Sequence, residues 1–354
     1  MADTGLTYEE AQKRAFNITL NNSERTARQI KQQYRIAFEQ INKELEVLYA
    51  KLNAANVPKD KYLNYALQAG RLEHLAKEVE AVFNPMYDDV MVSIRANSTR
   101  AMVNQYYMQQ YSMKWFAPSL GFSFVDKTAV DLSVWWTSEV WNRIKNDATK
   151  ASKYKRYVPR WALIKDTPFG PAKRPKAVTL KSLLLKNEKK QLRWIKNSIT
   201  QSLIQGRPIS KTSRLLRDTF GKSYRNSERV VRTETLRNLN AGDYLNSQTA
   251  REQGVQSNRR WIAILDTRTR QQSASMDGQY ADSLDNMFVY PNGARSFFPG
   301  GSGVAAYDIN ERCTAINEIP GRPVLARRGK DPVTGESKLM TYRDHNTWAK
   351  QNNL

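Results

Sequence analysis

Cysteine and histidine are almost missing from this chain of 354 residues, which holds only Cys313, His74 and His345. A single cysteine excludes an intrachain disulfide, which fits a reducing compartment without proving one. Metal sites of the Cys/His type need three or four converging ligands, and a Cys–His nucleophilic pair would require Cys313 to meet a distant histidine. We therefore expect no metal site, no cofactor and no thiol chemistry.

Long apolar runs are also missing. The longest cover only residues 161–164 and 183–185, far short of the roughly 20 residues that cross a bilayer. Residues 1–14 have no apolar core of the kind that marks a secretory signal. We expect no membrane span, although a basic face could still touch anionic lipid. The 40% hydrophobic content is enough for packed cores, and the length favours two or three domains.

Positive charge is abundant and concentrated. The chain has a formal net charge of +22, and residues 143–237 carry 26 Lys or Arg against 6 Asp or Glu. Apolar residues such as Trp161, Trp194 and Ile195 interrupt this stretch, so it is not a charged tail. Structured basic elements favour a surface that contacts nucleic acid, and the alternative is a solvated surface whose charge only maintains solubility.

No zinc-finger spacing, basic zipper or RNA-recognition signature accompanies this charge. Contacts should therefore be made to phosphates and should be largely independent of sequence. The candidate DNA-binding residues are Lys153, Lys155, Arg156, Arg160, Lys173, Arg174, Lys176, Lys186, Lys189, Lys190, Arg193 and Lys196.

Helical periodicity dominates the first third. Apolar residues recur every three or four positions from Ser23 to Asn53 and again from Tyr62 to Val82, with Pro58 in the intervening turn. This predicts two long helices folded as an antiparallel hairpin, with Pro85 ending the second and a weaker third helix over 86–111. The stripes could form an ordinary core, or they could bind another subunit.

The remaining chain changes character at about residue 258. Before it, the pattern predicts a linker and then helices, with a proline-rich loop over 158–178. The expected helices cover residues 128–151, 179–205, 208–220 (closed by Gly221) and 227–253. After it, the pattern predicts a strand, a hairpin around Pro291-Asn292-Gly293, an ordered piece and a loosely held tail; these cover residues 260–265, 286–298, 305–319 and 320–354.

The expected fold class is α+β: a mainly helical N-terminal two-thirds with a long hairpin, followed by a small α+β domain with a short antiparallel sheet. We divide the chain into four parts. These are a hairpin region that is a candidate for partner binding (1–118), a basic helical region with a proline-rich loop (119–205), an α+β domain (206–320) and a polar tail (321–354).

Five short motifs follow one another in the second half. They are RVVRTET at 229–235, WIAILDTRTR at 261–270, MDG at 276–278, FFPG at 297–300 and INERC at 309–313. Arginine and carboxylate pair in a bidentate way, so such groups can tie a strand end to a helix. The order and spacing of the five motifs resemble those of the phage head morphogenesis proteins, which are the minor head or minor capsid proteins of the Mu F type. The resemblance covers residues 206–320.

Two positions depart from that family. The family usually has a histidine where this chain has Ser273, and it tends to end in Asn-Cys-Arg-Cys where this chain has Asn310-Glu311-Arg312-Cys313. A metal site of relatives is therefore not carried over. We interpret the retained motif residues as a structural ion network rather than as catalytic groups; they are Arg232, Glu234, Asp266, Arg268, Arg270 and Asp277.

The resemblance implies a non-enzymatic virion component, made in the host cytoplasm and attached to the portal inside the capsid. Its implied partners are the portal protein and packaged double-stranded DNA, with a major capsid or scaffolding protein as a further candidate. One alternative is an enzyme on nucleic acid or nucleotide, either a nuclease or ADP-ribosyltransferase-like, because some relatives are fused to toxin domains. Another is an assembly adaptor that acts through the N-terminal hairpin and whose charge is incidental.

Overall fold

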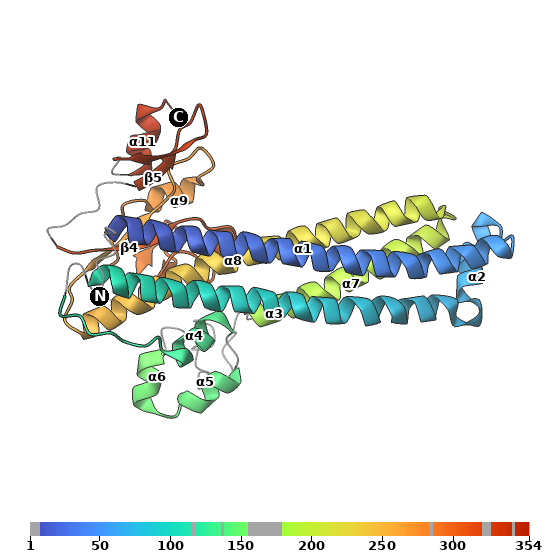
Figure 1. Cartoon of the computed structure of the whole chain (residues 1–354), viewed down its shortest axis with the longest axis horizontal. Helices are drawn as coiled ribbons and strands as arrows, with labels where there is room; N and C mark the ends of the chain where they lie inside the picture. Colours follow the sequence, from blue (N-terminus) through green and yellow to red (C-terminus); the bar gives the residue numbers. More distant parts are fainter. Residues whose placement is uncertain are drawn as a thin grey trace, which may run out of the picture. The chain divides into compact units, whose positions relative to one another are not determined.

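The computed structural model describes residues 8–114, 118–135, 138–154, 179–282, 286–320, 327–341 and 344–353. The long helices are α1 (Tyr8–Ala54), α3 (Arg71–Met113), α7 (Leu180–Ile204) and α8 (Ile209–Glu252). The short helices are η1 (Lys59–Lys61), α2 (Tyr62–Leu67), η2 (Gln68–Gly70), α4 (Lys127–Val134), α5 (Ser138–Ile144), α6 (Ala148–Tyr154), α9 (Gln271–Met276), α10 (Ala305–Asp308) and α11 (His345–Gln351). The strands are β1 (Asn258–Ile262), β2 (Phe288–Val289), β3 (Arg295–Ser296), β4 (Thr314–Glu318), β5 (Arg327–Lys330) and β6 (Ser337–Met340). The expected α+β class is confirmed (Figure 1).

The chain forms two compact units, and each draws on separated stretches of sequence. We call residues 24–96 and 176–231 the bundle unit, and residues 1–23, 97–175 and 232–354 the motif unit. Helices α1, α3 and α8 each contribute residues to both units.

The bundle unit packs parts of α1, α3, α7 and α8 around an apolar core (Figure 1). The hydroxyl of Tyr34 on α1 lies 2.6 Å from Gln191 on α7 and 2.9 Å from Ser227 on α8. Phe83 on α3 packs edge-on against Phe220 on α8. The core positions follow the predicted stripes, including Ile30, Ile41, Leu45 and Leu52 of α1 and Val79 of α3. Burial of one face of each helix explains why these long amphipathic segments are helical.

The turn between α7 and α8 requires a glycine. Gly206 has a φ of +56°, and a Cβ atom there would lie 2.6 Å from the carbonyl oxygen of Lys59. Beside it, the Tyr49 hydroxyl donates to the carbonyl of Arg207 at 2.9 Å. The predicted end of the basic helix at Gly206 is confirmed, because α7 ends at Ile204.

Several helix boundaries differ from the sequence expectation; α1, for example, begins at Tyr8 rather than at Ser23. Pro85 lies inside α3 rather than ending a helix, because Phe83 and Tyr87 on both sides are anchored in the core. The break comes earlier, at Ala69 and Gly70, which both have positive φ values. The predicted stop at Gly221 is also wrong: α8 continues through it, since a glycine costs a helix only about 1 kcal/mol and packing outweighs that cost.

The predicted helix over 128–151 is divided in the structure into α4, α5 and α6. The side chain of Asp126 caps α4 by accepting hydrogen bonds from the backbone of Thr128 and Ala129, at 3.0 and 3.2 Å. In the motif unit α4 packs through Val130 and Val134 against α3 and α8. Gly242 of α8 lies directly against the carbonyl of Met102 of α3, so a side chain at this position would collide with the backbone.

Short antiparallel sheets complete the motif unit. Strand β1 pairs with β4, placing Trp261 opposite Ala315, and β2 pairs with β3 as the predicted hairpin. Trp261, Met276, Phe288 and other apolar residues form a core beside these strands. No helix in the described part of the chain is long and apolar enough to cross a membrane.

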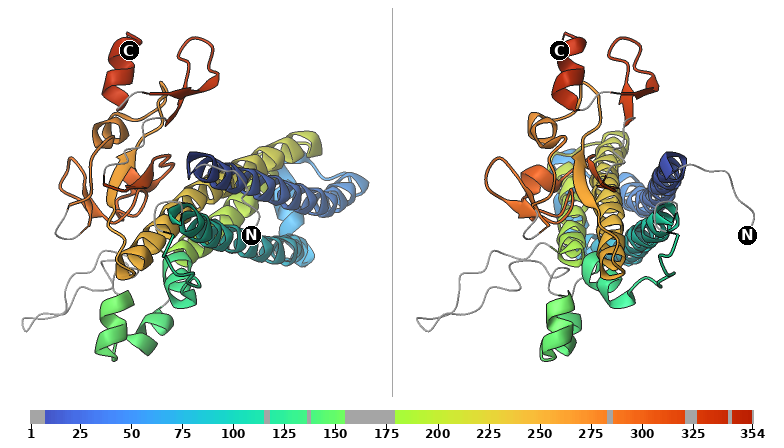
Figure 2. Two further views of the ribbon diagram at one scale, coloured as in Figure 1. Left: turned by 60° about the vertical axis from the view of Figure 1, so that its left-hand side comes forward. Right: turned by 90° about the vertical axis from the view of Figure 1, so that its left-hand side faces the viewer.

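The C-terminal segment differs from the loose tail that its polar composition predicts. Strands β5 and β6 form an antiparallel pair near the C-terminal helix α11 (Figure 2). Met340 and Trp348 pack with Leu265 into a small core. A few apolar residues and one buried arginine, Arg327, anchor the segment, and a composition average does not reveal them.

Candidate nucleic-acid interface and ion-pair network

Helix α7 presents a basic face to solvent. Thr179 caps its N-terminus in a reciprocal arrangement with Ser182. Buried residues such as Leu184 and Ile195 line one side of the helix. The opposite side carries four exposed cations, which we call the basic face of α7: Lys186, Lys189, Lys190 and Arg193. The ammonium group of Lys190 lies 4.7 Å from the ring centroid of Trp194, which helps to hold it in place.

Helix α8 carries a second basic face that the candidate residues did not include. One row of exposed cations lies along a single side of the helix, with Asp218 between the second and third members; the row consists of Lys211, Arg214, Lys222, Arg225 and Arg229. Leu216 and Phe220 are buried on the other side of the helix. Ser198 of α7 and Thr219 of α8 lie 3.0 Å apart, so the two helices are neighbours. The helical spacing of these cations is present in the sequence and could have indicated the basic face. The helix end wrongly predicted at Gly221 interrupted the row, so the face was not recognised.

The other candidate DNA-binding residues have different settings. Lys196 pairs with Glu80 of α3. Lys153 lies 2.9 Å from Asp126 in the motif unit, and this partner raises the pKa of Lys153. Six candidates lie outside the described residues: Lys155, Arg156, Arg160, Lys173, Arg174 and Lys176.

The motif residues of the motif unit form ion pairs, mostly with partners outside the predicted set. Asp266 is 3% exposed and receives two hydrogen bonds from Arg312, at 2.6 and 2.9 Å. Thr269 adds a third at 2.9 Å. Burial opposes ionisation, but the hydrogen bonds from Arg312 and Thr269 hold the pKa of Asp266 below its ordinary value. This aspartate fixes the exit of β1 to the segment that leads into β4.

Asp277 holds the most enclosed ion pair. Its side chain is completely buried and accepts two hydrogen bonds from Arg327 of β5, at 2.8 and 2.9 Å. The same carboxylate accepts from the backbone of Ala263 and of His345. Arg327 also donates to the carbonyl of Ala263. Asp277 therefore connects β1 with the C-terminal segment.

A polar cluster occupies the positions where the resembling family has its histidine and cysteine. Ser273 donates to Glu311 at 3.1 Å, and Arg270 pairs with the same carboxylate at 2.9 Å. Glu311 also accepts from the backbone of Arg312 and Cys313. Burial, and next the charge of Glu311, raise the pKa of the Cys313 thiol, so it is a poor nucleophile.

The last three motif residues differ in burial. Glu234 is buried and pairs with Arg237 on the same helix at 2.7 Å. Arg232 is exposed. Arg268 is also exposed, and its side chain reaches Asp266 only at 3.8 Å. These motif residues thus have separate surroundings rather than one common centre.

Sequence reasoning missed a buried pair next to these motifs. Asp243 on α8 and Arg259 on β1 are both about 1% exposed. Asn317 of β4 donates to Asp243 at 3.2 Å, and the Arg259 guanidinium lies 4.8 Å from the ring of Tyr244. Burial raises the pKa of Asp243 to about 7, against the opposing effects of Arg259 and Gln109. No sequence signal marks the pair, because Arg259 precedes the strand predicted over 260–265 and belongs to none of the five motifs.

The described residues include no group of three or more His, Cys, Asp or Glu side chains that could hold a metal ion. The motif carboxylates Glu234, Asp266 and Asp277 are each paired with an arginine, which neutralises the carboxylate and fixes its orientation.

Comparison with known proteins agrees with the motifs. Residues 193–316 match the family model described as "Phage Mu protein F like protein". The chain is 28% identical over 174 residues to the minor head protein GP7 of Bacillus phage SPP1, a match that covers 49% of this chain and 56% of that protein. It is also 26% identical over 155 residues to the NAD(+)–arginine ADP-ribosyltransferase EFV of Enterococcus faecalis, covering 44% of this chain and 30% of that protein. No solved structure matches significantly.

Proposed function

We propose that this chain, which carries the Mu F-like region of phage minor head proteins, is a structural head protein that contacts packaged double-stranded DNA without reading its sequence. The observation that supports DNA contact is the pair of basic faces on α7 and α8. Residues 179–231 hold 13 Lys or Arg and 3 Asp or Glu, a net charge of +10.

Duplex DNA presents a line of closely spaced phosphates. Cations on rigid helices suit this target because the protein loses little conformational entropy when it binds. The cations of α7 and α8 stand on helices whose opposite sides are buried, so their spacing is fixed by the fold. Lysine and arginine contacts to phosphate position a protein on the duplex but carry no sequence information.

The carboxylates of the motifs support a non-enzymatic role. A metal-dependent nuclease needs carboxylates that converge on an ion, and acid–base chemistry needs a titrating group near the substrate. Glu234, Asp266 and Asp277 each hold an arginine instead. The similarity to an ADP-ribosyltransferase covers 30% of that protein, so we do not transfer its activity to this chain.

The proposed place of the protein is the capsid interior near the portal, where it would be incorporated after synthesis in the host cytoplasm. The portal protein is the proposed partner of the hairpin, with a major capsid or scaffolding protein as a further candidate. The similarity to the SPP1 minor head protein supports a virion role.

Duplex binding measured against salt tests the DNA proposal. The full chain should bind a labelled random duplex at low salt, as measured by fluorescence anisotropy. If about six to ten phosphates are contacted, affinity should fall roughly 10³–10⁵-fold between about 50 and 200 mM salt. Absence of binding at low salt would contradict DNA contact, and absence of the chain from purified particles would contradict the head role.

A further inference from the structure

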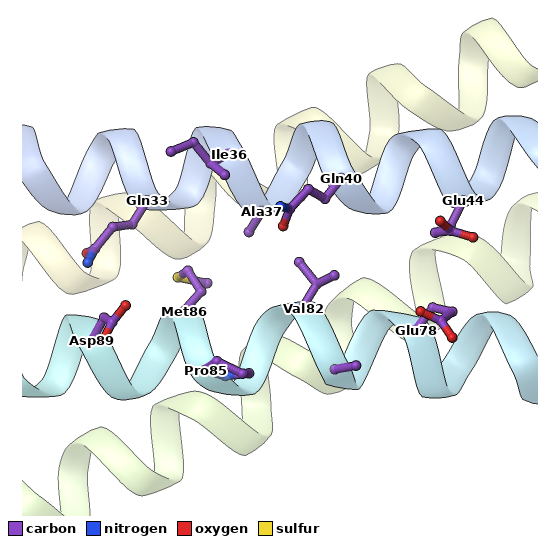
Figure 3. A pocket seen from close by; sticks show the side chains of 11 residues that line it. Gln33, Ile36, Ala37, Gln40, Glu44, Glu78, Val82, Pro85, Met86 and Asp89 are labelled. Carbon is purple, nitrogen blue, oxygen red and sulfur yellow. The ribbon is translucent and has the colours of Figure 1, made fainter.

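An open groove runs between α1 and α3 in the bundle unit (Figure 3). It has a volume of about 610 Å³, and its floor includes Ala37, Val82 and Met86. Ile36 and Pro85 stand at its sides. Ala37 and Met86 belong to the buried core, whereas Ile36, Ala81 and Pro85 are exposed and supply the accessible apolar surface of the groove.

Exposed apolar residues continue the same helix faces beyond the groove. Ile36 is 45% exposed, Val47 on α1 is 49% exposed, and Val92 on α3 is 66% exposed. Val47 follows Ile36 and Gln40 at helical spacing, and Val92 follows Val82, Pro85 and Asp89 in the same way. Polar residues separate Ile36, Val47 and Val92, so the three form no continuous apolar patch, but they add apolar area to the helix faces that a docked helix would cover.

The rim of the groove is acidic. Glu44 lies on the α1 side, and Glu78 and Asp89 lie on the α3 side (Figure 3). Gln33 and Gln40 complete the polar rim, and the residues lining the groove include no lysine or arginine. In a chain with a net charge of +22, three carboxylates around an apolar floor are a local reversal of sign.

We propose that this groove binds an amphipathic helix of a partner protein that carries an apolar stripe flanked by lysine or arginine. A helix fits because two adjacent helices form the walls, and because their backbones offer no open strand edge. The basic flanks follow from the acidic rim by charge complementarity. This inference deepens the partner role proposed for the hairpin and depends on that role, but not on DNA binding.

A designed probe tests the inference on the full chain. The probe is a synthetic helix with a leucine stripe flanked by lysines, compared with the same helix in which glutamates replace the lysines. Cys313 is buried, so a cysteine introduced as Ile36→Cys can be labelled selectively with an environment-sensitive dye. The lysine helix should shift the dye emission and bind at least about tenfold more tightly than the glutamate helix.

Matched charge reversals give the control. The variant Glu44→Lys/Glu78→Lys/Asp89→Lys should weaken binding of the lysine helix at least about tenfold. The variant Glu24→Lys/Asp60→Lys/Asp218→Lys changes net charge by the same amount at exposed positions that do not line the groove, and it should bind as the parent does. Circular dichroism checks that both remain helical.

Three results would overturn the inference. Equal loss of binding in both reversal variants would show that only overall charge matters. Lack of a dye response would show that the helix binds elsewhere. Concentration-dependent self-association that the groove variant abolishes would assign the groove to a second copy of this chain. A failed groove test with intact duplex binding leaves the DNA proposal standing, whereas loss of the chain from particles contradicts the head role itself.

Discussion

The basic faces of the bundle unit are exposed to solvent, whereas several carboxylates of the motif unit are buried. In the bundle unit the cations of α7 and α8 are exposed on helices held by an apolar core. In the motif unit Asp266, Asp277 and Glu311 are buried and hold arginines. Exposed cations contribute little to stability but can meet a polyanion, whereas buried pairs orient the backbone and are costly to break. Substitutions in the two units should therefore affect different measurements.

The largest stability effect should come from breaking the Asp277–Arg327 pair. Asp277→Ala leaves Arg327 buried without its countercharge and removes the acceptor for two backbone N–H groups. We expect the free energy of unfolding to fall by about 3–5 kcal/mol, measured by denaturant titration. Duplex affinity per folded molecule should stay at the parental value. A loss below about 1 kcal/mol would contradict the assigned role of this pair.

A second effect in the motif unit should depend on pH. Burial raises the pKa of Asp243 to about 7. Between about pH 4 and pH 7 the folded state therefore holds a proton that the unfolded state has lost. Stability should therefore fall as pH rises from about 4 to about 7, and it should level off above that. The change should be on the order of 2–4 kcal/mol. Asp243→Asn should flatten this dependence, as followed by thermal unfolding at several pH values; an unchanged slope would assign it to another group.

Removing cations from the bundle unit should change binding rather than stability. The variant Lys186→Gln/Lys189→Gln/Lys190→Gln/Arg193→Gln should lower duplex affinity at least about tenfold in moderate salt. It should also reduce the slope of log affinity against log salt by about 3.6, because each phosphate contact contributes about 0.9. The free energy of unfolding should change by less than about 0.5 kcal/mol.

The matched control removes the same charge from α1. Arg28, Lys31, Lys43 and Lys51 are exposed there, and residues 24–96 carry 11 Lys or Arg against 10 Asp or Glu, a net charge of +1. Replacing these four by glutamine should leave the salt slope nearly unchanged. Equal losses in the two variants would mean that binding follows net charge rather than the basic faces of α7 and α8.

The sequence predicted most of what local signals determine. The limits of α7 follow from a capping residue, Thr179, and a stopping glycine, Gly206, and both signals act within one turn. The apolar stripes of α1 and α3 predicted the faces that are buried. Pro85 and Gly221 misled the prediction because their local cost is small compared with the packing of a long helix.

For these ion pairs the sequence predicted one partner, the carboxylate, but not the arginine that it meets. The motifs identified Asp266 and Asp277, but their partners Arg312 and Arg327 lie 46 and 50 residues away. Periodicity shows which side of an element is buried, and it does not show which distant residue that side meets. The pair Asp243 and Arg259 was missed for the same reason, as was the order of the C-terminal segment, which depends on Arg327 and Trp348.

The smallest effect should come from Arg268, although it lies inside the Asp-Thr-Arg-Thr-Arg motif. Its side chain is 72% exposed and 3.8 Å from Asp266, whereas Arg312 holds the same carboxylate at 2.6 Å. Arg268→Ala should change the free energy of unfolding by less than about 0.5 kcal/mol in denaturant titrations, because an exposed ion pair contributes little. Arg312→Ala should cost several times more, since it leaves a buried carboxylate without its arginine. If the two variants were equally destabilised, burial would not be what separates structural from dispensable charge in this unit.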